Sequence, residues 1–189
     1  SSWATTSNMN VARHVLAGCG NTNNALSFGG YNGSANLATT EIWSGSSWAT
    51  TSNMNVARYY LAGCGNTNNA LSFGGYNGSH LATTEIWSGS SWTTTSNMNV
   101  AKDYLAGCGN VNNALSFGGD NGSYLATTEI WSGSSWTTTS NMNVARHYLA
   151  GCGNVNNALS FGGHNGSSYL SATEKWSGSS WATTSALNV

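Results

Sequence analysis

At 189 residues the chain is long enough for one compact domain or one array of repeats, and too short for two domains of ordinary size. Charged residues make up only 6% of it and the formal net charge is -1, so it lacks the basic surface that nucleic acid or an anionic membrane would need. No stretch approaches the roughly 20 apolar residues of a membrane-spanning helix, and Ser1-Ser2-Trp3 has neither Met nor a signal-peptide pattern, so we expect a mature or trimmed product without membrane insertion.

The tripeptide Ser-Ser-Trp recurs along the whole chain, and its successive copies are spaced by 45, 44, 44 and 45 residues. Its Trp residues are Trp3, Trp48, Trp92, Trp136 and Trp181. A period of about 40 to 50 residues is typical of propeller blades and helical solenoids, and the frequent Gly and the missing 3.6-residue apolar stripe favour β structure. We therefore expect one repeat domain over 1–189, with repeats at about 3–47, 48–91, 92–135 and 136–180 and a partial repeat at 181–189.

The second repeat predicts four short strands in chain order, over 59–65, 70–74, 82–87 and around Trp92. Between the second and third strands, Asn77-Gly78 predicts a type I′ hairpin turn, in which both residues have positive φ. The copies of this Asn each begin an Asn-Gly-Ser sequon, which would accept a glycan in a eukaryotic secreted protein; the turn explains the same residues without glycans. These residues are Asn32, Asn77, Asn121 and Asn165.

The landmarks of each unit resemble the kelch repeat: a Gly pair closing the second strand, an aromatic residue on the third strand and a Trp on the fourth. In the second repeat they are Gly74-Gly75, Trp87 and Trp92. The third-strand residue departs from the family, which more often has Tyr there. The resemblance covers essentially the whole chain and implies an all-β, kelch-type β-propeller with four blades of 44–45 residues, four strands each. The Ser, Thr and Asn richness is similar in texture to kelch arrays of bacteriophages and environmental bacteria.

The charged residues follow the repeat. Each unit has one acid after Thr-Thr or Ala-Thr and one base after Val-Ala, which we expect to pair within or between blades. The acids are Glu41, Glu85, Glu129 and Glu174, and the bases are Arg13, Arg58, Lys102 and Arg146. The four cysteines also occupy one repeated position, Ala-Gly-Cys-Gly, and we expect buried free thiols, with metal ligation or a cross-link between chains as alternatives. They are Cys19, Cys64, Cys108 and Cys152.

The two ends of the chain each carry a fourth-strand segment, Ser1–Ser7 and Ser179–Ser185, which predicts five outer strands for four blades. An unpaired outer strand is a template for another chain, so we expect self-association through the terminal outer strands, with a fragment of a longer array as the alternative. A closed ring of four blades, two chains sharing an eight-bladed ring and a head-to-tail filament all agree with the sequence.

The copies differ from one another mainly in three clusters, which follow Val-Ala-Arg or Val-Ala-Lys, Gly-Gly and Asn-Gly-Ser. In a four-stranded blade these connections lie on the same side, so we expect the variable residues to form one face of the protein. Because this face varies in Tyr, His and Asp while the rest of each repeat stays nearly uniform, we interpret it as a binding surface. Random drift of exposed loops is the alternative explanation. The predicted binding residues are His14, Tyr31, Tyr59, Tyr76, His80, Asp103, Asp120, Tyr124, His147, His164 and Tyr169. The His and Asp residues lack tight spacing, so we predict no metal site from them.

The sequence therefore predicts a non-enzymatic recognition module that binds a carbohydrate or protein receptor through one loop face, extracellularly or on a virion surface. A structural subunit of a homo-oligomer or filament is the alternative, suggested by the surplus strand and the low charge, and an engineered repeat would also explain such similar copies. We expect no cofactor, because no residue matches the copper site that kelch oxidases of the galactose oxidase type imply.

Overall fold

The computed structural model describes residues 4–188. These residues form sixteen strands and no helix, and so contain no helix long and apolar enough to cross a membrane. The strands make four antiparallel sheets, each built from four strands that are consecutive in the chain. The predicted all-β class and the four repeated four-stranded units are therefore confirmed.

All sixteen strands are four residues long, and the sheets repeat with the period of the sequence. The first sheet contains β1 (Ala17–Gly20), β2 (Ala25–Phe28), β3 (Thr40–Trp43) and β4 (Trp48–Thr51). The second contains β5 (Ala62–Gly65), β6 (Ala70–Phe73), β7 (Thr84–Trp87) and β8 (Trp92–Thr95). The third contains β9 (Ala106–Gly109), β10 (Ala114–Phe117), β11 (Thr128–Trp131) and β12 (Trp136–Thr139). The fourth contains β13 (Ala150–Gly153), β14 (Ala158–Phe161), β15 (Thr173–Trp176) and β16 (Trp181–Thr184).

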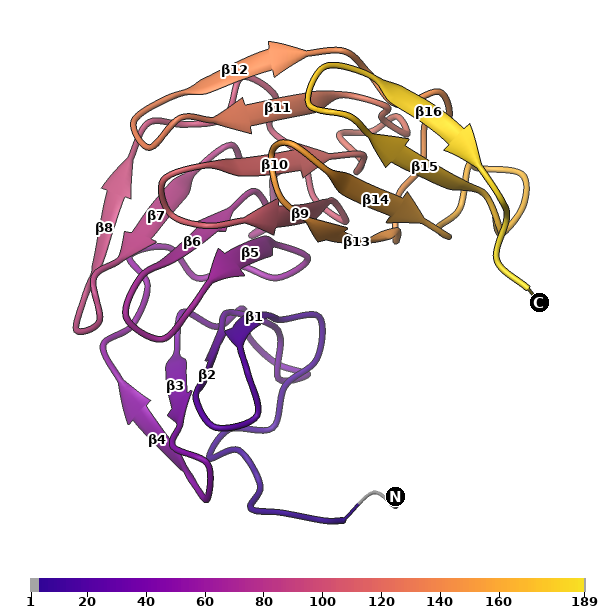
Figure 1. The fold of residues 1–189 in the computed structure, drawn as a ribbon. Coiled ribbons are helices and arrows are strands. Elements are labelled where there is room, and N and C mark those ends of the chain that lie inside the picture. The colour runs from indigo at the N-terminus through magenta and orange to yellow at the C-terminus, as the bar shows by residue number, and fades with distance from the viewer. Residues whose placement is uncertain (1–3, 189) are drawn as a thin grey trace.

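The four sheets follow one another in an arc, with the first strand of each sheet on the inside and the fourth strand on the outside (Figure 1). The inner strands of consecutive sheets pack side by side, β1 against β5, β5 against β9 and β9 against β13. Sheets one and four form the two ends of the arc (Figure 1). Each end sheet therefore has a neighbour on one face only.

One local prediction is wrong, and another is not tested by a single chain. Gly78 has a φ of 117°, but Asn77 does not have the positive φ that a type I′ turn requires, and its N–H bonds to Ser79 O at 3.3 Å within a longer loop. The expected surplus outer strand stays a prediction: residues 4–7 form no hydrogen-bonded strand within the single chain, as an outer strand that lacks its partner would. Residues 1–3 of that predicted segment lie outside the described residues.

Each sheet has two different faces, which the strand register defines. In the second sheet, Cys64, Leu71 and Ile86 lie opposite one another on neighbouring strands and form one face. Ala70, Trp87 and Trp92 lie on the other face. We call these the leucine face and the tryptophan face, and the terms apply to the equivalent residues of every sheet. Phe73 lies two residues after Leu71 and so belongs to the leucine face.

The core of the protein lies between the sheets, where the leucine face of one sheet packs on the tryptophan face of the next. At the first of these interfaces, the Trp92 ring lies 5.0 Å from the Phe28 ring, and Trp92 Nε1 donates a hydrogen bond to Thr40 Oγ1 at 2.9 Å. A Cβ on Gly63 would lie 2.4 Å from Cζ of Phe28, so this strand position needs glycine. The next two interfaces repeat these contacts, with Trp136 on Phe73 and Thr84 and with Trp181 on Phe117 and Thr128.

A buried ion pair holds each sheet to the segment that enters it, which confirms the predicted pairing and places it within one sheet. Arg58 Nη2 lies 2.7 Å from Glu85 Oε1, and both side chains are fully buried. Glu85 also accepts hydrogen bonds from the Asn55 N–H at 2.7 Å and the Val56 N–H at 3.2 Å. These bonds satisfy the carboxylate that burial would otherwise destabilise.

The third sheet has the weakest of these pairs and supplies a test. Lys102 Nζ lies 3.7 Å from Glu129 Oε1, and burial lowers the pKa of Lys102 to about 8. An arginine would restore the planar donor set that Arg58 uses, so Lys102→Arg is expected to stabilise the fold by about 1 kcal/mol. Thermal unfolding should show a rise of about 2 to 4 °C, and Arg58→Lys should lower the melting temperature. An unchanged or lower value for Lys102→Arg would contradict this.

Candidate functional site

The structure brings the residues of the three variable clusters together within each repeat. In the second repeat, Tyr76 makes isolated β-bridges to Tyr59 on one side and His80 on the other. The same arrangement recurs in all four repeats, which gives four triplets of residues that are far apart in sequence. The triplets are His14–Tyr31–Asn36, Tyr59–Tyr76–His80, Asp103–Asp120–Tyr124 and His147–His164–Tyr169. They contain all eleven predicted binding residues, and Asn36 is the one member that the prediction left out.

The triplets of neighbouring sheets contact one another and so form one continuous surface, which we call the loop face. The Tyr31 and Tyr59 rings lie 5.5 Å apart, across the boundary between the first two sheets. The Tyr124 and His147 rings stack at 4.5 Å across the boundary between the last two. Between them, His80 meets Asp103. Exposure varies strongly along this surface: Asp103 is 3% exposed and Tyr169 is 90% exposed.

Three tyrosines that the predicted binding set omits lie next to the loop face, toward the inner strands. Tyr60 and Tyr104 have ring centroids 3.6 Å apart, and Tyr104 and Tyr148 have centroids 4.1 Å apart. They line a cavity of about 240 Å³ together with leucines from all four repeats. Burial raises the pKa of Tyr104 and Tyr148, so their hydroxyls stay protonated and can donate hydrogen bonds.

These tyrosines have an unusual backbone. Tyr60, Tyr104 and Tyr148 have φ values of 55°, 50° and 55°, a region that bulky residues rarely adopt. Hydrogen bonds between consecutive repeats hold this conformation: the Tyr104 N–H donates to Tyr60 O at 3.0 Å, and the Tyr148 N–H donates to Tyr104 O at 3.1 Å. The sequence does mark this position as one where the repeats differ, because the first repeat has Val15 where the other three repeats have tyrosine. Strained residues that a surrounding network maintains are common at functional sites.

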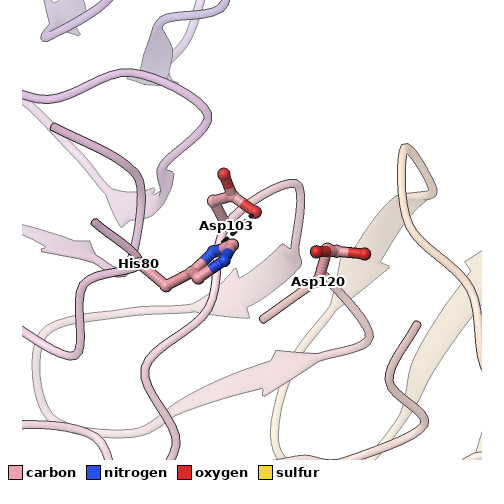
Figure 2. Close-up of side chains that lie close together, drawn as sticks. All are labelled: His80, Asp103 and Asp120. Carbon is pink, nitrogen blue, oxygen red and sulfur yellow. Dashed lines mark ion pairs between the residues drawn. The ribbon is translucent and has the colours of Figure 1, made fainter. Parts of the chain in front are cut away.

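The most polar part of the loop face joins the second and third sheets. His80, Asp103 and Asp120 offer ligand atoms that all lie within 4.8 Å of one another (Figure 2). His80 Nδ1 lies 3.4 Å from Asp103 Oδ1, and both atoms are shielded from solvent without a hydrogen-bond partner. Although these residues are distant in sequence, the bridges and the packing of the two sheets bring them together. This geometry makes them the residues that could hold a metal ion, which the sequence spacing did not indicate.

The electrostatics of this cluster are unfavourable for a carboxylate. Burial raises the pKa of Asp103, His80 opposes this shift and the nearby charge of Asp120 adds to it, which together place the pKa at about 6. The cluster borders a cavity of about 350 Å³ that four tyrosines also line. Ring faces and hydrogen-bonding groups thus share one concave surface. The lining tyrosines are Tyr59, Tyr60, Tyr76 and Tyr104.

A second candidate surface lies at the end of the arc, where the leucine face of the fourth sheet is uncovered. Leu159 is 37% exposed, whereas its counterpart Leu71 is 0% exposed. A cavity of about 380 Å³ opens here, lined by residues that include Cys152, Leu159 and Lys175. At the other end of the arc, Trp48 of the first sheet is half-buried, whereas Trp92 is buried. The two end sheets therefore expose opposite halves of the interface that the inner sheets bury.

The cysteines follow the same difference between inner and end sheets. All four are free; Cys64 and Cys108 are buried, as predicted, Cys19 is half-buried and Cys152 is exposed. Burial raises the pKa of Cys19 and Cys108 to about 12, so these thiols are poor nucleophiles. The prediction of a buried thiol is wrong for Cys152, because no sheet formed by residues 4–188 covers its face.

No protein-family model matches the chain, and no curated protein shows significant similarity to it.

Proposed function

We propose that the chain is a non-enzymatic recognition module of the kelch-type β-propeller class, which binds a carbohydrate or protein receptor through its loop face. The observation that supports this is the convergence of the variable positions: residues that differ between otherwise similar repeats lie in contact on one surface. Tyrosine offers large contact area at low entropic cost, and histidine and aspartate add directed hydrogen bonds. Such a module would act outside the cell or on a virion.

A carbohydrate suits the chemistry of this face best. The cavity beside Tyr59 and Tyr76 combines tyrosine rings with the carboxylates of Asp103 and Asp120. Apolar ring faces can pack against the C–H groups of a sugar, while carboxylates accept hydrogen bonds from its hydroxyls. The low overall charge of the protein also favours a neutral ligand over a polyanion.

The binding proposal predicts that replacing Tyr59, Tyr76 and Tyr124 together by alanine lowers receptor or glycan binding at least about tenfold, a loss of about 1.4 kcal/mol. The fluorescently labelled protein would be applied to a printed glycan array and to a panel of receptor proteins. The far-UV circular dichroism spectrum should stay unchanged, because all three side chains lie in loops.

The matched control is the triple variant Asn68→Ala, Asn112→Ala and Asn156→Ala, in the loops between the first and second strands of three sheets. Their side chains make no hydrogen bond within residues 4–188, so the fold should tolerate their loss. The proposal would be contradicted if the tyrosine variant bound as well as the asparagine variant, or if the parent protein bound nothing.

A second candidate function, a subunit that assembles with copies of itself, rests on the uncovered end faces. At each inner interface a tryptophan donates its indole N–H to a threonine hydroxyl of the preceding sheet; these residues are Trp92, Trp136 and Trp181. The end sheets keep the unused partners: within residues 4–188, Trp48 Nε1 has no acceptor and the Thr173 hydroxyl receives no tryptophan N–H. The leucine face of the fourth sheet in one copy matches the tryptophan face of the first sheet in another. We propose association through these faces, rather than through terminal outer strands.

A further inference from the structure

We propose that His80, Asp103 and Asp120 form a binding site for one divalent transition-metal ion, with Zn²⁺ as the best match. The site lies where the second and third sheets meet on the loop face (Figure 2). The inference is independent of the proposed receptor, because the metal alone can be tested.

The position of Asp103 is the first reason. Its side chain is only 4% exposed, and its Oδ1 has no hydrogen-bond partner although it faces His80 Nδ1 at 3.4 Å. A buried carboxylate oxygen without a well-placed donor is costly, and the buried imidazole nitrogen beside it is unpartnered as well. A cation between them would satisfy both atoms at once.

The donor set and spacing are the second reason. One imidazole nitrogen and two carboxylates match the ligands that Zn²⁺ takes at about 2.0 to 2.2 Å, which places ligand atoms about 3.4 Å apart in a tetrahedral site. The candidate atoms lie within 4.8 Å of one another, so small rotations of the half-buried His80 and Asp120 side chains would close the site. Asp120 Oδ1 accepts the Gly122 N–H at 2.8 Å, which orients this carboxylate and leaves its second oxygen free for the metal.

Three protein ligands are too few for Ca²⁺, which takes six to eight oxygens, and the imidazole favours a transition metal over Mg²⁺. A Zn²⁺ ion held by three protein ligands keeps a fourth position for water or a ligand atom. In this chain that position would face the tyrosine-lined cavity beside Tyr59 and Tyr76.

The other repeats supply controls, because among the three sheet boundaries within residues 4–188 only this one combines a histidine with two aspartates. The equivalent residues at the first boundary are Asn36, Tyr59 and Tyr76, and at the third Tyr124, His147 and His164. His14→Asn therefore tests whether Zn²⁺ binds to an isolated histidine outside the proposed site. His164→Asn tests whether Zn²⁺ binds instead to the neighbouring pair His147 and His164.

Isothermal titration of the metal-free 189-residue chain with ZnCl₂ should show one ion per chain, and Co²⁺ should give visible d–d absorption. Asp103→Asn should lower Zn²⁺ affinity at least about 100-fold, as should Asp120→Asn, which changes a more exposed residue and guards against a folding defect. His14→Asn and His164→Asn should bind like the parent.

The same variants separate a metal site from a plain ion pair between His80 and Asp103. For a metal site, Zn²⁺ raises the melting temperature of the parent but not of Asp103→Asn, and the metal-free variant is at least as stable as the metal-free parent because a buried charge is gone. Any one of four results would overturn the proposal. The first three are that the parent binds no Zn²⁺, that Asp103→Asn binds it as tightly as the parent, and that His164→Asn loses binding; the fourth is that metal-free Asp103→Asn melts at a lower temperature than the metal-free parent.

Discussion

Replacing Trp136 by alanine is expected to lower the free energy of unfolding by about 3 to 5 kcal/mol, the usual cost of removing a buried tryptophan. Trp136 is 5% exposed and packs 5.0 Å from the Phe73 ring of the preceding sheet. Its indole N–H also bonds to Thr84 Oγ1 at 2.9 Å, so truncation leaves both a cavity and an unpaired hydroxyl between two sheets. Urea unfolding followed by tryptophan fluorescence would measure the loss.

Trp48→Ala is the matched control, because Trp48 occupies the same strand position of an end sheet. It contacts Trp43 of its own sheet at 5.6 Å, and residues 4–188 form no preceding sheet for it to pack on. Its replacement should cost about 1 kcal/mol at protein concentrations low enough to keep the chain monomeric. Equal losses for the two variants would show that the packing of leucine face on tryptophan face is not what stabilises the array.

Features that lie within one repeat could be predicted from the sequence. The period located the four sheets, and the predicted strands contain β5 to β7, each of which is shorter than predicted by one to three residues. The pairing of Arg58 with Glu85 also followed from the sequence, because the repeat presents the same acid and base in every copy. The variable positions pointed to the triplets, since each triplet joins residues of one repeat.

Features that depend on the neighbouring repeat could not be predicted in this way. The tetrapeptide Ala-Gly-Cys-Gly is identical in β5 and β13, yet Cys64 is buried and Cys152 is exposed, because only β5 has a neighbour on both sides. The positive φ of Tyr104 depends on a hydrogen bond to Tyr60 in the preceding repeat. His80 and Asp103 likewise meet across a sheet boundary that no spacing within a repeat reveals.

The uncovered end faces lead to the second large effect: Leu159→Asp is expected to abolish self-association of the chain. Leu159 is 37% exposed on the leucine face of the fourth sheet, so aspartate costs the isolated chain little. In an assembly of copies the same aspartate would replace an apolar contact and would be buried against the tryptophan face of the next first sheet, where its only charged neighbour within residues 4–188 is Lys175 on the adjacent strand, so its desolvation opposes association. Sedimentation equilibrium should show an assembly for the parent and a monomer for the variant.

Lys175 allows the opposite change on the same face. It occupies the position of Ile86, which is only half-buried at the inner interface, so the lysine stem can pack there while its ammonium group reaches solvent. Lys175→Ile removes this charge and should tighten association, whereas Tyr169→Asp adds a charge on the loop face and should leave it unchanged. A monomeric parent at all concentrations, or an assembly that Leu159→Asp leaves intact, would contradict the proposed contact.

Because the contact joins different faces of two copies, it is heterologous and leaves one free face at each end of a pair. Whether such pairs grow or close depends only on the rotation between consecutive sheets, since the new contact repeats the packing within the chain. A single discrete mass at rising concentration would therefore indicate ring closure, as a propeller requires. A mass that increases steadily with concentration would indicate an open filament held by the same residues.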